Sequence, residues 1–104
     1  AENAAVKYLK KLKFEIVDQN WRTRWCEIDI VAKKDKRVYF VEVKYRATDN
    51  QGSGLEYITP TKLKQMKFAA EFWAHENAWT DDCSLAVIEV SGAEFMVTNF
   101  IADL

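Results

Sequence analysis

The sequence predicts an α/β fold, in which a mixed central β-sheet is flanked by helices. Five segments rich in Val, Ile, Phe, Tyr and Trp have the length and composition of strands. Two other segments repeat apolar residues at spacings of three and four, which is typical of amphipathic helices. The expected order of elements along the chain is therefore α-β-β-β-α-β-β.

The first half of the chain predicts one helix and three strands. Residues 2–13 form the expected helix, with Ala5, Leu9 and Leu12 on one side and lysines elsewhere. The strands follow in FEIVDQNWRTR, which ends near Thr23, in CEIDIVAKK and in KRVYFVEVKYRA. The turn at Asp35-Lys36 lacks the glycine that a tight primed turn prefers, so we expect a loop longer than two residues there.

The second half predicts a loop, a helix and two strands. The loop is TDNQGSG, and the helix opens with Thr59 as N-cap and Pro60 at its first position. The apolar stripe of this helix consists of Leu63, Met66, Ala70 and Trp73. The last two strands are SLAVIEVSG and EFMVTNFIA, which are joined around Gly92.

Composition favours a packed globule over a linker or a membrane protein. The chain of 104 residues is 49% hydrophobic and holds only 3 Gly and 1 Pro, which predicts a single domain over residues 1–104. Its apolar runs are shorter than a membrane span and no secretory signal is recognisable, so we expect a cytoplasmic location. Cys26, Cys83 and His75 are too few for a structural zinc site, and the cysteines are expected to be free, buried thiols.

Charge is unevenly distributed along the chain. All fifteen Lys and Arg residues lie between Lys7 and Lys67, which gives residues 1–67 a net charge of +6 and residues 68–104 a net charge of −7. A phosphate backbone is the partner that best fits a basic half. The alternative is a chance imbalance spread over solvated faces.

Charged residues also interrupt the apolar strands. In VYFVEVKYR, the alternation of side chains places Glu42 and Lys44 on the same face as Phe40. If Asp35 and Lys36 form the middle of the turn, Asp29 lies opposite Glu42. Two opposed carboxylates repel each other unless they share a cation, and Mg²⁺ suits such oxygen ligands.

Lys44, on the same face, could then hold or deprotonate the attacking water, or stabilise charge on phosphate oxygens. A solvated ladder of opposite charges explains Glu-x-Lys equally well when it is taken alone. Asp29 is harder to explain in this way, because it interrupts the apolar run of EIDIVA and needs a partner there.

The spacing of these charged residues resembles that of the PD-(D/E)xK nuclease superfamily. Asp29 is followed, after twelve residues, by Glu42-Val43-Lys44, and this pattern lies between two predicted helices. Within this superfamily, the chain is similar to the bacterial YraN/UPF0102 family, which resembles archaeal Holliday-junction resolvases. The matching segments are AENAAVKYLKK, NWRTRWCEIDIVA, VYFVEVKYR and TPTKLKQ.

The resemblance implies a restriction-endonuclease-like core and a Mg²⁺ or Mn²⁺ cofactor. It implies that Asp29, Glu42 and Lys44 are catalytic, together with Glu2 of the first helix. The implied metal ligands are Asp29, Glu42, Glu2 and the carbonyl oxygen of Val43.

Basic residues near these positions are candidates for nucleic-acid binding, because arginine and lysine side chains bind phosphates. The candidates are Arg22, Arg24, Arg46, Lys62 and Gln65. Trp21 and Trp25 are expected in the core. His75 is expected to be solvated near the end of the second helix.

Three functions remain open from the sequence. The first is a metal-dependent endonuclease that hydrolyses phosphodiester bonds of DNA, with branched or flapped DNA as candidate substrates. The second is a non-catalytic nucleic-acid-binding module with the same fold. The third is a protein-interaction module that uses the acidic half of the chain. A homodimer is compatible with each of them, but no residue pattern specifies its interface.

Overall fold

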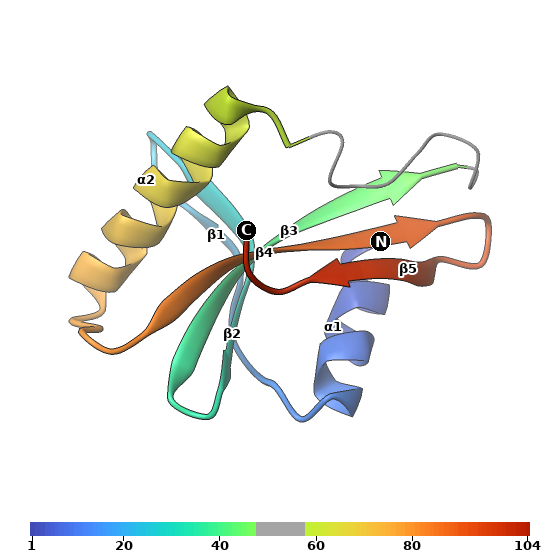
Figure 1. Cartoon of the computed structure of the whole chain (residues 1–104), viewed down its shortest axis with the longest axis horizontal. Helices are drawn as coiled ribbons and strands as arrows, with labels where there is room; N and C mark the ends of the chain where they lie inside the picture. Colours follow the sequence, from blue (N-terminus) through green and yellow to red (C-terminus); the bar gives the residue numbers. More distant parts are fainter. Residues whose placement is uncertain (48–57) are drawn as a thin grey trace.

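The order of elements predicted from the sequence is confirmed in the computed structural model, which describes residues 1–47 and 58–104 (Figure 1). The elements are α1 (Glu2–Lys11), β1 (Glu15–Arg22), β2 (Glu27–Lys34), β3 (Arg37–Arg46), α2 (Pro60–Glu76), β4 (Cys83–Ser91) and β5 (Met96–Ile101). The predicted TDNQGSG loop lies outside the described residues.

The five strands form one mixed sheet in the order β1-β2-β3-β4-β5. Neighbouring strands are antiparallel except for β3 and β4, which are parallel. A parallel pair needs a crossover connection, and the segment between β3 and β4 contains α2. The predicted mixed sheet is therefore confirmed.

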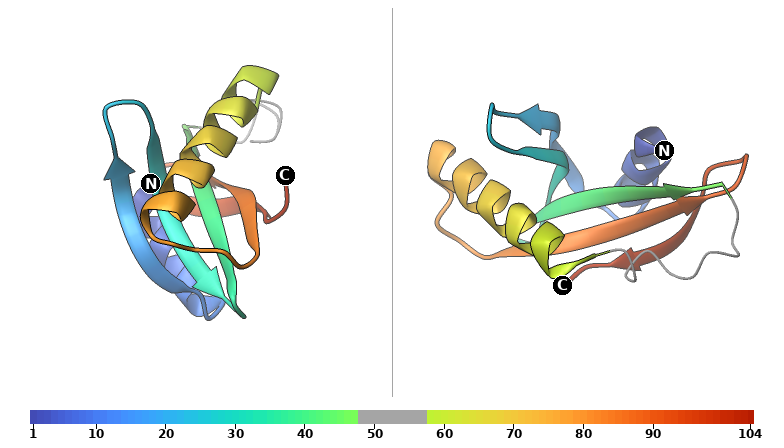
Figure 2. Two further views of the ribbon diagram at one scale, coloured as in Figure 1. Left: turned by 90° about the vertical axis from the view of Figure 1, so that its left-hand side faces the viewer. Right: turned by 90° about the horizontal axis from the view of Figure 1, so that it is seen from above.

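The two helices pack on opposite faces of the sheet (Figure 2). Leu9 of α1 packs in a cluster with Ile30 and Val41, whereas Trp73 of α2 packs in a second cluster with Phe40. Because side chains alternate along β3, Glu42 and Lys44 lie on the same face as Phe40, as the sequence predicts, and α2 packs on that face.

The turn between β2 and β3 is shorter than expected. Lys34 pairs with Arg37, so Asp35 and Lys36 form a two-residue turn, and both have positive φ angles of 52° and 67°. These left-handed angles match the twist of the flanking strands even without glycine, and aspartate tolerates them better than most residues do. The expectation of a longer loop is wrong, whereas the predicted register is confirmed.

The helix starts and stops have local causes. Thr59 caps α2 as predicted, because its Oγ1 accepts a hydrogen bond of 3.0 Å from the Lys62 backbone N–H. Helix α1 ends at Lys11, two residues before the expected end, and Lys13 then turns the chain with a φ of 73°. Leu12 is consequently exposed rather than part of the buried stripe.

Three further expectations concern burial. Cys26 and Cys83 are free thiols, as predicted, but Cys26 is only half-buried and Cys83 is exposed, so the expectation that both are buried is wrong. His75 is exposed in the last turn of α2, in agreement with the prediction. Trp21 is half-buried against the α2 cluster, whereas Trp25 is 65% exposed, so the expectation that it lies in the core is wrong.

Neither of the two helices among the described residues has the length and apolar character required to cross a membrane.

Candidate functional site

Strands β2 and β3 separate at Asp29. Their backbone pairing runs from Lys34 and Arg37 to Ile30 and Val41. At the next position, Oδ2 of Asp29 accepts a hydrogen bond of 2.8 Å from the Val43 backbone N–H. A side chain thus replaces the backbone contact, and the Asp29 carboxylate lies in the fork between the two strands.

The backbone of β2 is irregular at this point. Ile28 and Val31 both pack on the α2 side of the sheet, although residues three apart on a regular strand face opposite sides. Opposite Asp29 on β1 lies Asn20, which has a left-handed φ of 50°. Asparagine tolerates this conformation better than most residues. Because the alternation breaks here, Asp29 does not occupy a regular strand position. Its side chain lies at the edge of β2 that faces β3.

Val43 presents a second polar group to the same fork. In an extended strand, the N–H and C=O groups of one residue point to the same neighbouring strand. Because the Val43 N–H points to Asp29, its carbonyl oxygen points to the β2 side as well. The backbone therefore places an oxygen of Val43 where the resemblance implies a metal ligand.

Helix α1 brings Glu2 toward the fork. Glu2, Ala5 and Leu9 are spaced as neighbours on one side of a helix, and both apolar residues are buried against the sheet. The Oε1 atom of Glu2 is buried and accepts no hydrogen bond from the residues that the structure describes. A buried carboxylate oxygen of this kind needs a donor or a cation.

The surroundings of Asp29 favour its protonated form. The pKa of Asp29 is raised from the ordinary 3.8 to about 6, chiefly by burial, while the hydrogen bond from the Val43 N–H acts in the opposite direction. The negative charges of Glu42, Glu2 and Glu27 contribute to the same rise. Four carboxylates from α1, β2 and β3 therefore influence one another at this end of the sheet.

Two lysines neutralise Glu42. Its Oε2 atom lies 3.3 Å from Nζ of Lys44 and 3.2 Å from Nζ of Lys62. Lys44 comes from the same strand, whereas Lys62 reaches the carboxylate from the first turn of α2. The α2 helix thus adds a second cation to the predicted Glu-x-Lys pair.

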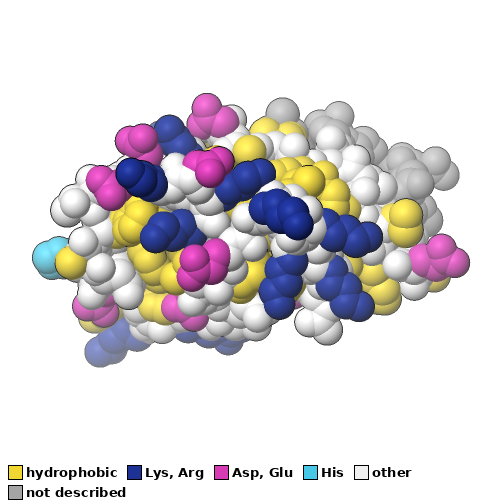
Figure 3. Space-filling model, turned by 90° about the horizontal axis from the view of Figure 1, so that it is seen from below, with side chains coloured by type: hydrophobic (Ala, Val, Ile, Leu, Met, Phe, Trp, Pro, Cys, Tyr) yellow, Lys and Arg dark blue, Asp and Glu magenta, His cyan; other side chains and the backbone are white. Residues whose placement is uncertain are grey.

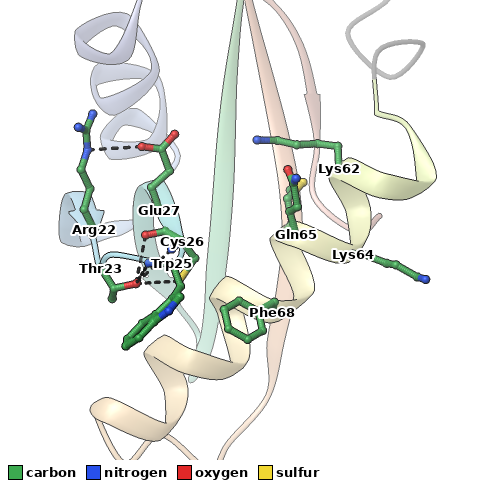
Figure 4. Close-up of a pocket in the computed structure, with 10 residues that line it drawn as sticks. Arg22, Thr23, Trp25, Cys26, Glu27, Lys62, Lys64, Gln65 and Phe68 are labelled. Carbon is green, nitrogen blue, oxygen red and sulfur yellow. Dashed lines mark hydrogen bonds and ion pairs between the residues drawn. The ribbon is translucent and has the colours of Figure 1, made fainter.

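A groove leads from Glu42 along α2. Its volume is about 620 Å³, and it separates the end of the β1–β2 hairpin from α2 (Figure 4). The residues that line it include Arg22, Trp25, Glu27, Lys62, Gln65 and Phe68. A smaller hollow, also lined by Glu27, continues to Glu42. Three of the predicted phosphate contacts, Arg22, Lys62 and Gln65, therefore lie along one groove.

The other two predicted phosphate contacts are not among the residues that line the groove. Arg24 follows the end of β1, and its guanidinium lies 5.4 Å from the ring centre of Trp25. Arg46 is only 5% exposed, and its Nε lies 2.8 Å from Oε2 of the equally buried Glu89. The expectation that Arg46 contacts phosphate is corrected, because an internal ion pair holds its guanidinium away from the surface.

Sequence reasoning did not assign Glu27 or Phe68 to the site. Glu27 raises the pKa of Asp29, lines the groove and pairs with Arg22 at 3.4 Å. Its position two residues before Asp29 on one strand is a signal that could have suggested proximity. Phe68 lies outside the predicted apolar stripe of α2, which marks it as an aromatic residue without a place in the core.

Basic residues also gather away from the groove. Lys7, Lys10 and Lys11 are exposed on α1, and Figure 3 shows Lys and Arg side chains close together on the surface seen from below. The basic half of the sequence is thus divided between at least two surfaces, of which only the groove adjoins Glu42.

The donor set at the fork fits a hard divalent cation. Mg²⁺ commonly takes one or two carboxylates, with water or phosphate at its other positions. Asp29, Glu42 and the Val43 carbonyl supply such oxygens, and the buried Oε1 of Glu2 is a further candidate. Among the described residues, no three acidic, His or Cys side chains already converge on one point, so Glu42 would have to exchange its lysines for the ion.

We expect Asp29→Asn to stabilise the metal-free protein above pH 6. The folded state holds a proton on Asp29 more tightly than the unfolded state, so the stability from this proton is complete below pH 3.8 and is lost as the pH rises through about 6. Asparagine carries no charge at any pH. The melting temperature of the variant should therefore exceed that of the wild type by an amount that grows from pH 4 to pH 7.

Added Mg²⁺ or Mn²⁺ should reverse this order at pH 8, because a cation stabilises the folded wild type and asparagine binds it less well. Asp35→Asn, in the exposed turn, is the matched control and should follow the wild type throughout. Equal metal-dependent increases in the melting temperatures of wild type and Asp29→Asn would contradict a metal site at Asp29.

Comparison with known proteins gives the relationships of the chain. Residues 1–90 match the family described as "Uncharacterised protein family UPF0102". A UPF0102 protein of Sulfurihydrogenibium sp. (strain YO3AOP1) is 39% identical over 92 residues, which cover 88% of this chain and 80% of the relative. UPF0102 proteins of Mycolicibacterium vanbaalenii and Vibrio parahaemolyticus are 39% and 38% identical over 72 residues, covering 69% of this chain and 60% of each relative. The chain belongs to the UPF0102 family.

Proposed function

We propose that this protein is a metal-dependent endonuclease that hydrolyses phosphodiester bonds of DNA. The observation that carries the proposal is the arrangement at the fork of β2 and β3, where Oδ2 of Asp29 accepts the 2.8 Å hydrogen bond from the Val43 N–H and Glu42 precedes Val43 on the same strand. Nζ of Lys44 lies 3.3 Å from Oε2 of Glu42. Acidic oxygens next to a lysine supply the donors and the positive charge that hydrolysis of a phosphodiester requires.

Each residue has a distinct role in the proposed reaction. When bound, Mg²⁺ or Mn²⁺ supplies a Lewis acid that activates water and draws charge from the phosphate. Asp29, Glu42 and the Val43 carbonyl would hold the ion. Lys44 Nζ, once released by Glu42, would orient the attacking water or stabilise the negative charge on the phosphate oxygens.

The groove supports DNA as the substrate. Arg22 and Lys62 contribute positive charge along it, and Gln65 contributes an amide that can donate to phosphate oxygens. Lys62 also connects the groove with the carboxylates, because its ammonium group lies 3.2 Å from Glu42. The sequence resemblance to PD-(D/E)xK nucleases points to the same chemistry.

The test is a cleavage assay with a panel of DNA structures. Labelled duplex, single-stranded, flap and four-way DNA are incubated with the protein and either Mn²⁺ or EDTA. We expect at least one substrate to be cut with Mn²⁺ and none with EDTA, and Asp29→Asn to remove the activity. Binding of DNA with no cleavage of any substrate by the wild type would contradict the endonuclease proposal.

A non-catalytic nucleic-acid-binding module is the second candidate. It is favoured by the state of Glu42, whose charge is already balanced by Lys44 and Lys62 without a metal ion. In that case, the wild type and Asp29→Asn should bind the DNA panel equally well in EDTA, and Mn²⁺ should change neither binding nor the integrity of the DNA.

A further inference from the structure

Four aromatic side chains form a row, of which two, Trp25 and Phe68, line the groove. Phe72 of α2 lies at its centre, with ring centres 5.9 Å from Trp21, 6.0 Å from Trp25 and 6.1 Å from Phe68. Trp21 is half-buried, but Trp25 is 65% and Phe68 is 50% exposed. Two large aromatic side chains that both pack on Phe72 therefore expose half or more of their surface to solvent.

The backbone holds Trp25 in this exposed position. Thr23 Oγ1 accepts hydrogen bonds of 3.1 Å from the backbone N–H groups of Trp25 and Cys26. The Thr23 N–H in turn donates a bond of 2.8 Å to the Cys26 carbonyl oxygen, which closes the turn between β1 and β2. Because these hydrogen bonds hold the turn before a ligand binds, the backbone that carries the indole loses little conformational entropy on binding.

Phe68 is presented by a different mechanism. The buried side of α2 consists of Met66, Ala69, Ala70 and Trp73. Phe68 lies beside that stripe and contacts Phe72, four residues later, on the neighbouring edge of the helix. Packing of α2 on the sheet thus directs Phe68 to the groove side, where Figure 4 shows it close to Trp25.

Positive charge accompanies the aromatic row on both sides of the groove. Arg24 stacks on Trp25 at 5.4 Å, Arg22 lines the hairpin side and Lys62 lines the helix side. Figure 4 shows Lys62 extending toward the sheet, and its Nζ lies 3.2 Å from Oε2 of Glu42. Aromatic rings between cations match a polymer that alternates flat bases with phosphates.

We propose that this row is a stacking site for unpaired bases, so that the substrate carries a single-stranded segment next to the phosphate at the fork. The inference rests on the proposed function, because it requires the same groove to bind nucleic acid. It adds the class of substrate. Bases paired within a duplex cannot offer their faces to Trp25 and Phe68, whereas the bases of a flap, a gap or a frayed end can.

Binding is measured in EDTA, so that turnover cannot interfere. Fluorescein-labelled (dT)12 and a duplex of the same length are titrated with the protein, and anisotropy is recorded. We expect Trp25→Ala and Phe68→Ala each to weaken binding of (dT)12 by roughly five- to one-hundredfold, with a much smaller effect on the duplex. Trp25→Phe, which keeps a ring, should stay within a few fold of the wild type.

Phe95→Ala is the matched control, because Phe95 is 47% exposed and stacks on Tyr45 outside the groove. It should leave the binding of both oligonucleotides unchanged. Equal affinity of wild type, Trp25→Ala and Phe68→Ala for (dT)12 would overturn the inference, as would the absence of any (dT)12 binding by the wild type.

The two proposals can fail separately. If the panel of DNA structures is cut with Mn²⁺ but affinity for (dT)12 does not depend on Trp25 or Phe68, the stacking site fails and the endonuclease stands. If (dT)12 binding depends on both rings and no DNA is cut, the endonuclease fails and the stacking site remains as the ligand site of a binding module.

Discussion

Lys44→Ala is expected to lower single-turnover cleavage of DNA by on the order of a hundredfold or more, while DNA affinity stays within a few fold. Lys44 is proposed to act on the attacking water or on the phosphate that is cut, so its removal affects the transition state more than the bound ground state. Glu42 keeps Lys62 as a partner at 3.2 Å, which preserves the charge balance of the variant.

Lys62→Ala should differ from Lys44→Ala in a measurable way. If Lys62 contacts one phosphate, its removal weakens binding and lowers the slope of log affinity against log salt by roughly 0.9 on duplex DNA. Lys67→Ala, on the exposed side of α2, is the matched control and should change neither rate nor slope. Filter binding over a salt series, beside single-turnover cleavage, gives both quantities.

Cleavage by Lys44→Ala at the wild-type rate would contradict the proposed role of Lys44. The Glu42-Lys44 pair would then be a solvated ladder of opposite charges, which the sequence alone also allows. The endonuclease proposal would lose the residue that most directly connects the carboxylates with phosphate chemistry.

Arg46→Ala should reduce the free energy of unfolding by about 3–5 kcal/mol, because it leaves the Glu89 carboxylate buried without the guanidinium. Glu89 is 4% exposed, so bulk water solvates its charge poorly once the partner at Oε2 is lost. Thr98 and Asn99 contact the other oxygen, Oε1, at 3.0 Å and 3.5 Å and would not compensate for the missing positive charge. Urea denaturation measures this change.

Two variants make that measurement specific. Arg46→Met combined with Glu89→Met removes both charges and should be more stable than Arg46→Ala, since no unpaired charge remains buried. Arg22→Ala breaks the exposed pair with Glu27 and should cost less than about 1 kcal/mol. An Arg46→Ala protein with wild-type stability and weakened DNA binding would show that Arg46 contacts phosphate after all.

Much of the fold follows from local patterns in the sequence. Spacings of three and four predict α1 and α2, and the preference of Thr59 and Pro60 for a helix start predicts where α2 begins. Alternation along β3 predicts that Glu42 and Lys44 share one face with Phe40. On the condition that Asp35 and Lys36 form the turn, the sequence predicts the register of the hairpin, and the structure confirms that register as far as the pair of Ile30 and Val41.

The conformation of single residues was harder to predict. The positive φ of Asn20 and the hydrogen bond from the Val43 N–H to Asp29 depend on how β1, β2 and β3 twist together. The sequence predicts that the carboxylates of Asp29 and Glu42 repel each other, whereas in the structure each carboxylate has a different partner. Asp29 occupies the fork between the strands, and Glu42 pairs with lysines on the α2 face.

The order of elements and the face shared by Phe40, Glu42 and Lys44 follow from the sequence, because each depends on residues close together in the chain. The pairing of Arg46 with Glu89 of β4, the contact of Lys62 of α2 with Glu42, and the position of Trp25 and Phe68 along one groove appear only in the tertiary structure. These contacts join segments far apart in the sequence. Alternation specifies the face of a side chain, but burial depends on which distant segment packs over that face.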